Sequence, residues 1–273
     1  MEILQITPEQ AQAFLESEVA AREIDPSFLQ TPAWAQVKVG WQSKVIGFFE
    51  AKELVGTALV LARKMPKLNR YFLYIPEGPA LPPKYLAAAV PLLRAYAISQ
   101  NGFALRVGPM VVKNRWNSET IKEALADESK KSLQEVTPTW INSDANAIEN
   151  ILRVNGFKPS VDDVNGFAAG QPKYVHQLAL TGKSEADVLE GFNQLWRRNI
   201  KKGEKENVQV IRGSREDLAK FHEVYLETAT RDHFTPRPLS YFEKMWDAMR
   251  KENENNFTLF WQNGMKALSL QLF

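Results

Sequence analysis

Apolar and polar positions in the first half of the chain follow helical and strand spacing in turn. Thr7, Pro8 and Gln10 form a helix start, with Thr7 as N-cap and Gln10 closing a capping box. An apolar face follows at helical spacing. The elements expected after it are strands at 44–49 and 55–62 with a turn near Lys52-Glu53, a strand at 70–75, a helix at 85–99, a strand at 103–107 and two short helices after Ser118 and Asp144.

A similar order of elements starts again near residue 174. The expected elements are a strand at 174–180, a helix capped by Ser184 and Asp187 that continues through Trp196, a strand at 208–211, a helix capped by Ser214 and Asp217, a helix at 239–251, and a hairpin of 257–262 and 266–273 that turns at Asn263-Gly264. Helices mixed with antiparallel hairpins in both halves predict an α+β architecture. The loop at 166–172 contains Gly, Ala and Pro, so we expect domains at 1–171 and 172–273.

Composition is that of an ordinary folded protein and narrows its class. The 273 residues are 44% hydrophobic and 24% charged, and no apolar run approaches the roughly 20 residues that span a bilayer. The N-terminus lacks the basic patch and apolar stretch of a signal peptide. There is no cysteine, so a cytoplasmic protein is expected. A net charge of +2 means that any anion site must be a local cluster of cations.

Motifs for metal, nucleotide and hydrolytic chemistry are missing from the sequence. The histidines at 176, 222 and 233 fit no standard metal spacing, so no metal site is expected. Arg231, Asp232 and His233 hold triad-like residue types, but adjacent side chains point apart and no nucleophile accompanies them. The glycine-rich loop with which acyl-CoA enzymes hold a pyrophosphate is also not visible.

Two stretches have both a structural and a functional interpretation. Trp34, Val37 and Trp41 share a helical face next to Lys38, which suits either core packing with a snorkelling lysine or a lysine held by aromatic rings to meet a phosphate or carboxylate. The second stretch is a basic run near a helix C-terminus, which suits either a solvated cap or phosphate contact with RNA or a nucleotide sugar. Its cations are Arg197, Arg198, Lys201 and Lys202.

The stretch RDHFTPRPLSYF at 231–242 gives the sharpest candidate for substrate binding. If Pro238 is the first residue of the following helix, Arg237 and Tyr241 can face one way at its N-terminus, which favours anions. The arginine offers a planar fork for a diphosphate, and the tyrosine offers a hydroxyl or a stacking ring. Asp232 and His233 are then local turn residues before Thr235-Pro236.

Four runs together resemble the Fem family (FemABX) of aminoacyl-tRNA-dependent peptidyltransferases, which build peptidoglycan bridges. The runs are FLQTPAWAQVKVGW, LYIPEGPAL, LWRRNIKKGEKENVQV and ETATRDHFTPRPLSYFEKM. The resemblance implies two tandem acetyltransferase-like (GNAT-like) domains. It also implies transfer of an amino acid from aminoacyl-tRNA, with no other cofactor, to the side-chain amine of the stem peptide. The acceptor is a UDP-linked muramyl-pentapeptide or its lipid-linked form.

The resemblance also assigns residues and a cellular setting. Lys38, Arg237 and Tyr241 match residues that bind the precursor, and the basic run lies where tRNA phosphates could bind. A monomer at the inner face of the membrane, without stable insertion, is expected. The sequence departs from the family in two ways. The coiled-coil arm of many members is absent, and the family continues past residue 273, so the second domain is expected to be incomplete and the catalytic residues, unknown here, to lie beyond it.

Two alternatives to an active aminoacyltransferase remain open at this point. The first is a catalytically inactive shortened paralogue that only binds the precursor. The second is an N-acyltransferase of the same superfamily, which the missing pyrophosphate loop disfavours.

Overall fold

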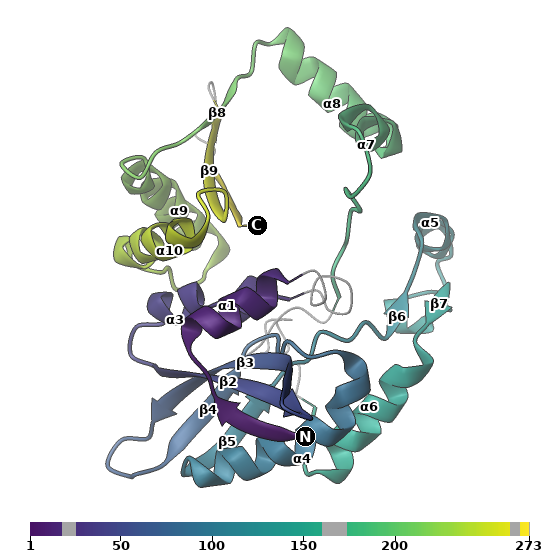
Figure 1. Cartoon of the computed structure of the whole chain (residues 1–273). Helices are drawn as coiled ribbons and strands as arrows, with labels where there is room; N and C mark the ends of the chain where they lie inside the picture. Colours follow the sequence, from purple (N-terminus) through teal and green to yellow (C-terminus); the bar gives the residue numbers. More distant parts are fainter. Residues whose placement is uncertain (18–25, 160–173, 263–267, 273) are drawn as a thin grey trace. The chain divides into compact units, whose positions relative to one another are not determined.

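The chain divides into two compact units, Met1–Gln171 and Pro172–Phe273. The computed structural model describes residues 1–17, 26–159, 174–262 and 268–272 (Figure 1). Each unit combines helices with antiparallel strands, which confirms the expected α+β class. The linker at 166–172 and the turn at Asn263-Gly264 lie outside the described residues.

Unit 1 is built on a mixed sheet with helices packed against it. Its elements are β1 (Glu2–Gln5), α1 (Pro8–Glu16), η1 (Phe28–Gln30), α3 (Pro32–Val37), β2 (Gln42–Glu50), β3 (Glu53–Lys64), β4 (Tyr71–Ile75), α4 (Pro83–Ser99), β5 (Gly102–Val107), β6 (Asn114–Arg115), α5 (Ser118–Ala126), η2 (Leu133–Glu135), β7 (Trp140–Ile141) and α6 (Ser143–Val154). The helices and strands expected from the sequence up to Gly156 are all present, and β1, η1, η2 and the short pair β6–β7 were not expected.

In the described part of unit 1, five strands form one sheet in the order β1-β2-β3-β4-β5. The first four pair antiparallel, whereas β4 and β5 are parallel. A parallel pair needs a crossover, and the 17-residue helix α4 supplies it. The crossover brings the carboxyl ends of β4 and β5 to the same edge of the sheet.

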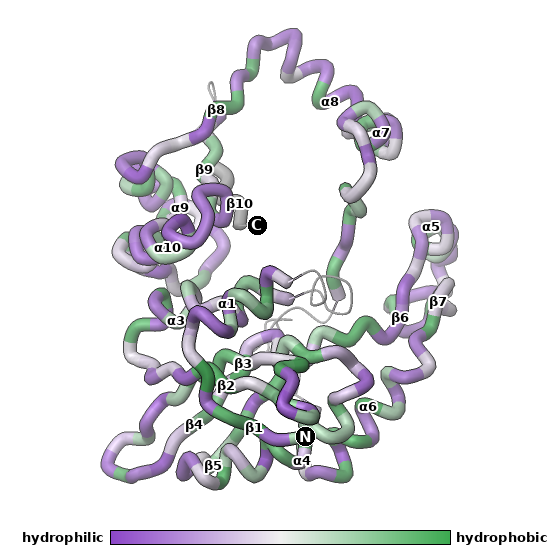
Figure 2. The backbone as a smooth tube through the Cα atoms, viewed as in Figure 1, coloured by the Kyte–Doolittle hydropathy of each residue, from purple (hydrophilic) through white to green (hydrophobic). Residues whose placement is uncertain are grey.

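The hydrophobic core of unit 1 lies between the sheet and α4. Ile46, Val60, Leu73 and Ile75 of the strands are almost fully buried against Leu86, Ala89 and Leu93 of α4. Alternate residues such as Leu59 and Leu61 are equally buried on the opposite face, where α1 and α3 pack against the strands. Figure 2 shows hydrophobic stretches running through β2 and β3, as a sheet covered on both faces requires.

Local sequence explains how these elements begin and turn. Thr7 caps α1, and Gln10 returns a hydrogen bond of 2.9 Å to the Thr7 N–H, so the predicted capping box is confirmed. The β2–β3 turn was predicted near Lys52-Glu53. The two turn residues are instead Ala51 and Lys52, with φ of 48° and 71°, the left-handed pair that a two-residue hairpin needs.

Unit 2 has a smaller sheet with two long helices beside it. Its elements are α7 (Glu185–Gly191), α8 (Gln194–Lys205), β8 (Val210–Arg212), α9 (Leu218–Asp232), α10 (Leu239–Glu252), β9 (Phe257–Gln262) and β10 (Leu268–Leu272). In the described residues the strand order is β10-β9-β8, all antiparallel. Phe257 and Leu259 of β9 and Met245 and Met249 of α10 are buried. Helix α10 packs against both β9 and α9.

The strand predicted at 174–180 is wrong. Residues 175–180 have no regular structure, and their apolar side chains stay exposed, including Val175 at 67% and Leu180 at 56%. An alternating pattern forms a strand only when a neighbouring strand supplies its hydrogen bonds. Within the described residues, no strand pairs with this segment.

The helix expected to run from Ser184 through Trp196 is broken in two. Phe192 is extended, with ψ of 148°, and ends α7. The Asn193 side chain then accepts a 2.9 Å hydrogen bond from the Trp196 N–H and starts α8. An asparagine that bonds the backbone in this way favours a helix start over a helix interior. The Ser184 capping box itself is confirmed.

Two predicted boundaries also shift because backbone groups are already bonded. The strand expected at 208–211 begins at Val210, since the Val208 N–H closes the end of α8 on the Gly203 carbonyl at 2.9 Å. Helix α9 begins at Leu218 after the Asp217 carboxylate has accepted the Ser214 N–H at 2.9 Å. The predicted start of α10 at Leu239 is confirmed, and Pro238 is its N-cap rather than its first residue.

Candidate functional site

Arg237 and Tyr241 lie together at the start of α10. Pro238 is extended as the N-cap, and its carbonyl accepts the Tyr241 N–H at 2.9 Å, which places Tyr241 in the first helical turn. The guanidinium carbon of Arg237 lies 5.4 Å from the centre of the Tyr241 ring. Arg237 is exposed and Tyr241 is half-buried. The pairing predicted from the sequence is therefore present, although Arg237 precedes the helix.

The Tyr241 hydroxyl is held in its neutral form. Burial raises the pKa of Tyr241 above its ordinary value of 10.0, the Arg237 cation opposes that rise, and the neighbouring Tyr225 adds to it. A hydroxyl that keeps its proton is a hydrogen-bond donor. Arg237 and Tyr241 thus present a cation and a neutral donor side by side, a combination suited to phosphate oxygens.

A group of packed aromatic rings lies next to the pair of Arg237 and Tyr241. Phe242 is only 6% exposed and meets Phe221 at 4.9 Å and Tyr225 at 5.1 Å between ring centres. Tyr241 meets Phe242 edge to face at 5.5 Å. His222 also lies beside this group and contacts the Arg237 backbone. No sequence motif marks His222 or Tyr225 as a site residue, although their 222/225 spacing places both on one face of α9.

Arg231, Asp232 and His233 form no catalytic arrangement. The Arg231 guanidinium binds the Asp232 carboxylate with two hydrogen bonds of 2.8 and 3.0 Å. His233 has a φ of 56° and ends α9 in the left-handed conformation. The interpretation as a turn residue is confirmed for His233, whereas Asp232 is the last residue of α9.

Lys38 belongs to unit 1 and sits at the C-cap of α3. Its ammonium nitrogen lies 5.3 Å from the centre of the Trp34 ring, and Trp34 is only 6% exposed. Helix α3 ends at Val37, so Trp41 is not on the same helical face, contrary to the expectation. Trp41 instead packs against Phe72 and Tyr74 of β4, with ring centres 6.1 and 6.4 Å away.

The first two of the four characteristic runs, those around Lys38 and Glu77, are bonded to each other in unit 1. The Gln30 side chain donates to the Pro76 carbonyl and accepts the Leu59 N–H at 3.0 Å. Ser27 donates to the Glu77 carboxylate. The segment that leads into α3, and so to Lys38, is therefore tied to the loop that follows β4.

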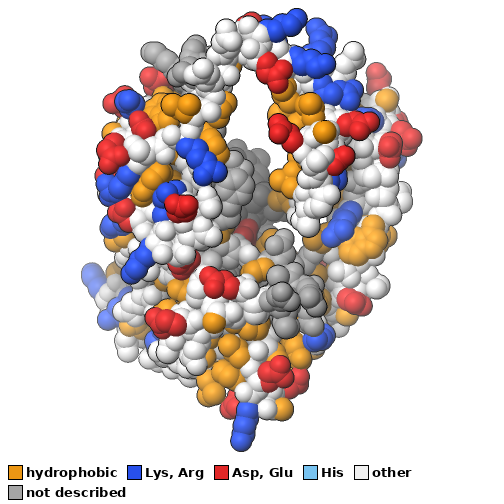
Figure 3. Space-filling model, turned by 45° about the horizontal axis from the view of Figure 1, so that its top comes forward, with side chains coloured by type: hydrophobic (Ala, Val, Ile, Leu, Met, Phe, Trp, Pro, Cys, Tyr) orange, Lys and Arg blue, Asp and Glu red, His pale blue; other side chains and the backbone are white. Residues whose placement is uncertain are grey.

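The basic run lies along α8 rather than only at its C-terminus. Figure 3 shows Lys and Arg side chains gathered over this helix. Arg197 donates to the Glu190 carbonyl at 3.0 Å, and Lys202 lies 3.7 Å from Glu206. Arg198 and Lys201 are exposed. Leu195 and Trp196 are each 60% exposed beside them, so α8 presents cations next to apolar side chains.

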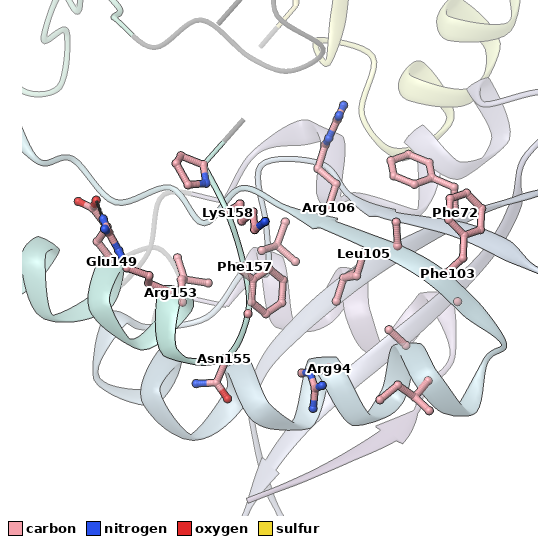
Figure 4. Close-up of a pocket in the computed structure, with 18 residues that line it drawn as sticks. Phe72, Arg94, Phe103, Leu105, Arg106, Glu149, Arg153, Asn155, Phe157 and Lys158 are labelled. Carbon is pink, nitrogen blue, oxygen red and sulfur yellow. Dashed lines mark hydrogen bonds and ion pairs between the residues drawn. The ribbon is translucent and has the colours of Figure 1, made fainter. Parts of the chain in front are cut away.

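A cavity of about 790 Å³ lies along the open edge of β5 in unit 1 (Figure 4). Leu105 and Phe157 face each other across its interior, and Phe72 and Phe103 lie at one end (Figure 4). Arg106 points away from Leu105 and Phe157, and its guanidinium carbon lies 5.6 Å from the centre of the Phe72 ring. The Glu149 carboxylate is held by Arg153 at 2.9 Å and by Lys113 at 2.7 Å. Sequence patterns gave no sign of this cavity, because its lining comes from β4, β5, α4, α6 and residues 155–159.

The described residues offer neither a cluster of metal ligands nor a helix that could span a membrane. Among residues 1–17, 26–159, 174–262 and 268–272, no group of three or more His, Asp or Glu side chains is arranged to hold a metal ion. In the same part of the chain, no helix has both the length and the apolar composition needed to cross a membrane.

The comparisons with known proteins identify the family. The sequence model of the FemAB family matches residues 6–260, so this chain belongs to that family. It is 28% identical over 265 residues to the lipid II:glycine glycyltransferase of Staphylococcus saprophyticus subsp. saprophyticus, covering 93% of this chain and 54% of that protein. It is 25% identical over 264 residues to the same-named protein of Staphylococcus aureus strain MRSA252, covering 93% and 53%.

A solved structure agrees with the fold. The crystal structure of FemX superposes with a TM-score of 0.67 at 24% identity, covering 96% of this chain and 57% of that one. The chain thus spans about half the length of the curated relatives it matches. Lys38 lies in unit 1, and Arg237 and Tyr241 lie in unit 2.

Proposed function

We propose that this chain transfers an amino acid from aminoacyl-tRNA to the side-chain amine of the stem peptide of a peptidoglycan precursor. The observation that carries the proposal is the FemAB match along residues 6–260. Relatives that bear the name lipid II:glycine glycyltransferase favour a lipid-linked acceptor over a UDP-linked one. The pairing of Arg237 with Tyr241 supports a diphosphate-binding role for unit 2.

In this proposal both units, 1–171 and 172–273, are acetyltransferase-like domains. The sheet of unit 1 supports this assignment. Four antiparallel strands lead into a parallel β4–β5 pair joined by α4, and the carboxyl ends of that pair lie beside the loop that Gln30 holds. Ligands of α/β sheets commonly bind at the carboxyl ends of parallel strands.

The chemistry requires positioning more than a covalent nucleophile. The stem-peptide amine attacks the ester carbonyl of the aminoacyl-tRNA and forms a new amide C–N bond. The ester C–O bond to the tRNA ribose breaks, and the proton lost by the amine ends on the ribose hydroxyl. Arg237, Tyr241 and Lys38 would hold the precursor, with Arg197, Arg198, Lys201 and Lys202 along the tRNA backbone.

The proposal also includes the oligomeric state, the co-substrate and the cellular location of the protein. The protein acts as a monomer, needs no cofactor or metal besides its aminoacyl-tRNA co-substrate, and works in the cytoplasm at the inner face of the membrane, where a lipid-linked acceptor is exposed. A cation and a neutral hydroxyl at the start of α10 suit a ligand whose charge is a diphosphate.

Two measurements on the purified protein test this function. In calorimetric titrations, binding is expected for lipid II in detergent micelles and for UDP-linked muramyl-pentapeptide. With tRNA charged with radiolabelled amino acids, label is expected on the stem-peptide amine. A precursor whose stem-peptide amine is acetylated is the matched control, since it keeps the diphosphate but cannot accept an amino acid. Failure of both precursors to bind would overturn the proposal. Binding without transfer would leave only a precursor-binding module, and acetyl-CoA turnover would indicate an N-acyltransferase.

Tyr241→Phe is expected to weaken precursor binding about 3- to 10-fold, the typical net effect of losing one hydrogen bond. Because the pKa of Tyr241 is raised above its ordinary value, the loss is expected to be the same at about pH 6.5 and about pH 9. Titrations of wild type and variant at both pH values check this. A loss that shrinks between them would mean that the hydroxyl ionises in that range, against the raised pKa.

A further inference from the structure

Both peptide groups that flank the Arg237 side chain are held by α9. The Arg237 N–H donates to the Tyr225 hydroxyl oxygen at 3.3 Å, and the Arg237 carbonyl accepts from His222 Nε2 at 2.9 Å. His222 and Tyr225 are three residues apart on one helix, so they project from the same face. One hydrogen bond on each side of the Arg237 Cα atom therefore fixes the position of the backbone from which the Arg237 side chain extends.

The rings of His222 and Tyr225, which donate to and accept from the Arg237 backbone, are themselves packed against other aromatic side chains. Tyr225 meets Phe242 edge to face at 5.1 Å and Phe234 at 5.5 Å. His222 lies 6.2 Å from both Tyr225 and Phe242. Phe242 is buried and follows Tyr241 directly in α10. The rings that fix Arg237 therefore pack on the residue next to Tyr241, which links the two members of the pair.

The bond from His222 also determines the state of its ring. A carbonyl oxygen only accepts hydrogen bonds, so His222 Nε2 must carry a hydrogen. The Tyr225 oxygen accepts the Arg237 N–H and keeps its own hydrogen to donate elsewhere. Neither side chain needs to touch a ligand for this arrangement to act.

We propose that His222 and Tyr225 are positioning residues that hold the Arg237 backbone and so keep its guanidinium beside Tyr241 for an anionic, diphosphate-bearing ligand. This inference rests on the proposed function for the identity of that ligand. It deepens the proposed function by assigning two residues that act through Arg237. A free arginine side chain samples many rotamers, whereas one anchored at its base offers its planar fork in a narrower range of directions.

The first test reads the position of Arg237 without any ligand. In the full chain, the Arg237 Nε–H signal in a ¹⁵N–¹H spectrum is expected to be shifted by the Tyr241 ring, 5.4 Å from the guanidinium carbon. His222→Ala and Tyr225→Phe are expected to move that signal toward the value of an unconstrained arginine. His222→Gln is expected to restore it, because a side-chain amide N–H can replace the imidazole donor. Glu223→Gln, at an exposed neighbour on α9, is the matched control.

The second test reads affinity for UDP-linked muramyl-pentapeptide. His222→Ala is expected to weaken binding about 3- to 10-fold, the typical effect of one net hydrogen bond. In an Arg237→Ala background, His222→Ala is expected to cause no further loss, because His222 acts through Arg237. A purely structural role would lower affinity equally in both backgrounds.

The outcomes separate this inference from the proposed function. If wild type binds neither the UDP-linked nor the lipid-linked precursor, the proposed function fails, and the Arg237 signal alone decides the positioning role. An Arg237 signal unchanged in His222→Ala and Tyr225→Phe overturns the inference, and so does an equal loss of affinity in both backgrounds. If His222→Ala does not fold, Tyr225→Phe provides the comparison, because it removes the acceptor of the Arg237 N–H.

Discussion

Arg237→Ala is expected to weaken binding of UDP-linked muramyl-pentapeptide about 10- to 100-fold and to leave the free energy of unfolding nearly unchanged. A charge-assisted hydrogen bond contributes about 1.5–3 kcal/mol, and each 1.4 kcal/mol is a factor of ten in affinity. The Arg237 side chain is exposed, so its removal leaves no cavity in the fold. Calorimetric titration gives the affinity, and urea unfolding gives the stability.

Two variants sharpen the test of Arg237. Arg237→Lys keeps the charge but loses the planar fork, so an intermediate loss is expected. Arg231→Ala removes a nearby arginine whose guanidinium already binds Asp232 at 2.8 Å, so little change is expected. Equal affinity of wild type and Arg237→Ala would remove Arg237 from the site. An equal loss in Arg231→Ala would show a general effect of charge.

Gln30→Ala is expected to lower the free energy of unfolding by about 2–4 kcal/mol. Gln30 is only 2% exposed, and its amide satisfies the Leu59 N–H and the Pro76 carbonyl. Each buried polar group left without a partner costs about 1–3 kcal/mol. Because the same amide ties the α3 segment to the loop after β4, weaker precursor binding through Lys38 is expected as well. Urea unfolding and titration check the two effects.

Gly78 provides a direct check on the Gln30 account. A Cβ atom at Gly78 would lie 2.5 Å from both the amide carbon and the amide oxygen of Gln30, which cannot move without breaking its hydrogen bonds. Gly78→Ala is therefore expected to destabilise wild type by about 1–3 kcal/mol, and by much less in a Gln30→Ala background. Gly108→Ala is the control, because its nearest contact would be an ordinary 3.8 Å. Additive effects of Gln30→Ala and Gly78→Ala would contradict the clash.

Most elements of unit 1 were predictable because their signals are local. The capping box at Thr7 and the helix that became α4 depend on residues within a few positions of each other. The elements of unit 2 were harder to predict, because some of them depend on more than local signals. The segment at 174–180 alternates like a strand, but an alternating segment becomes one only if a neighbour pairs with it. The break before Asn193 depended on a choice between two local hydrogen-bonding patterns that the apolar spacing did not reveal.

The candidate site was predictable only in part. Spacing placed Arg237 and Tyr241 four residues apart near a helix start. In the structure the Arg237 guanidinium carbon lies 5.4 Å from the centre of the Tyr241 ring. Spacing also placed Trp41 beside Trp34, which is wrong because α3 ends at Val37 and Trp41 packs on β4 instead. The supports of the site come from elsewhere in the chain. His222 reaches Arg237 across 15 residues, and Gln30 reaches Pro76 across 46.

The sequence by itself determined the α+β class, most helix starts and the resemblance to the Fem family, and it supplied the candidate residues for binding an anion. These features depend on residue types and on short spacings between residues, both of which can be read directly from the sequence. Only the tertiary structure decided that Gln30 ties two of the characteristic runs together and that His222 and Tyr225 hold Arg237 from both sides. Such contacts form when the fold brings distant segments together, and no periodicity along the chain encodes which buried donor meets which acceptor.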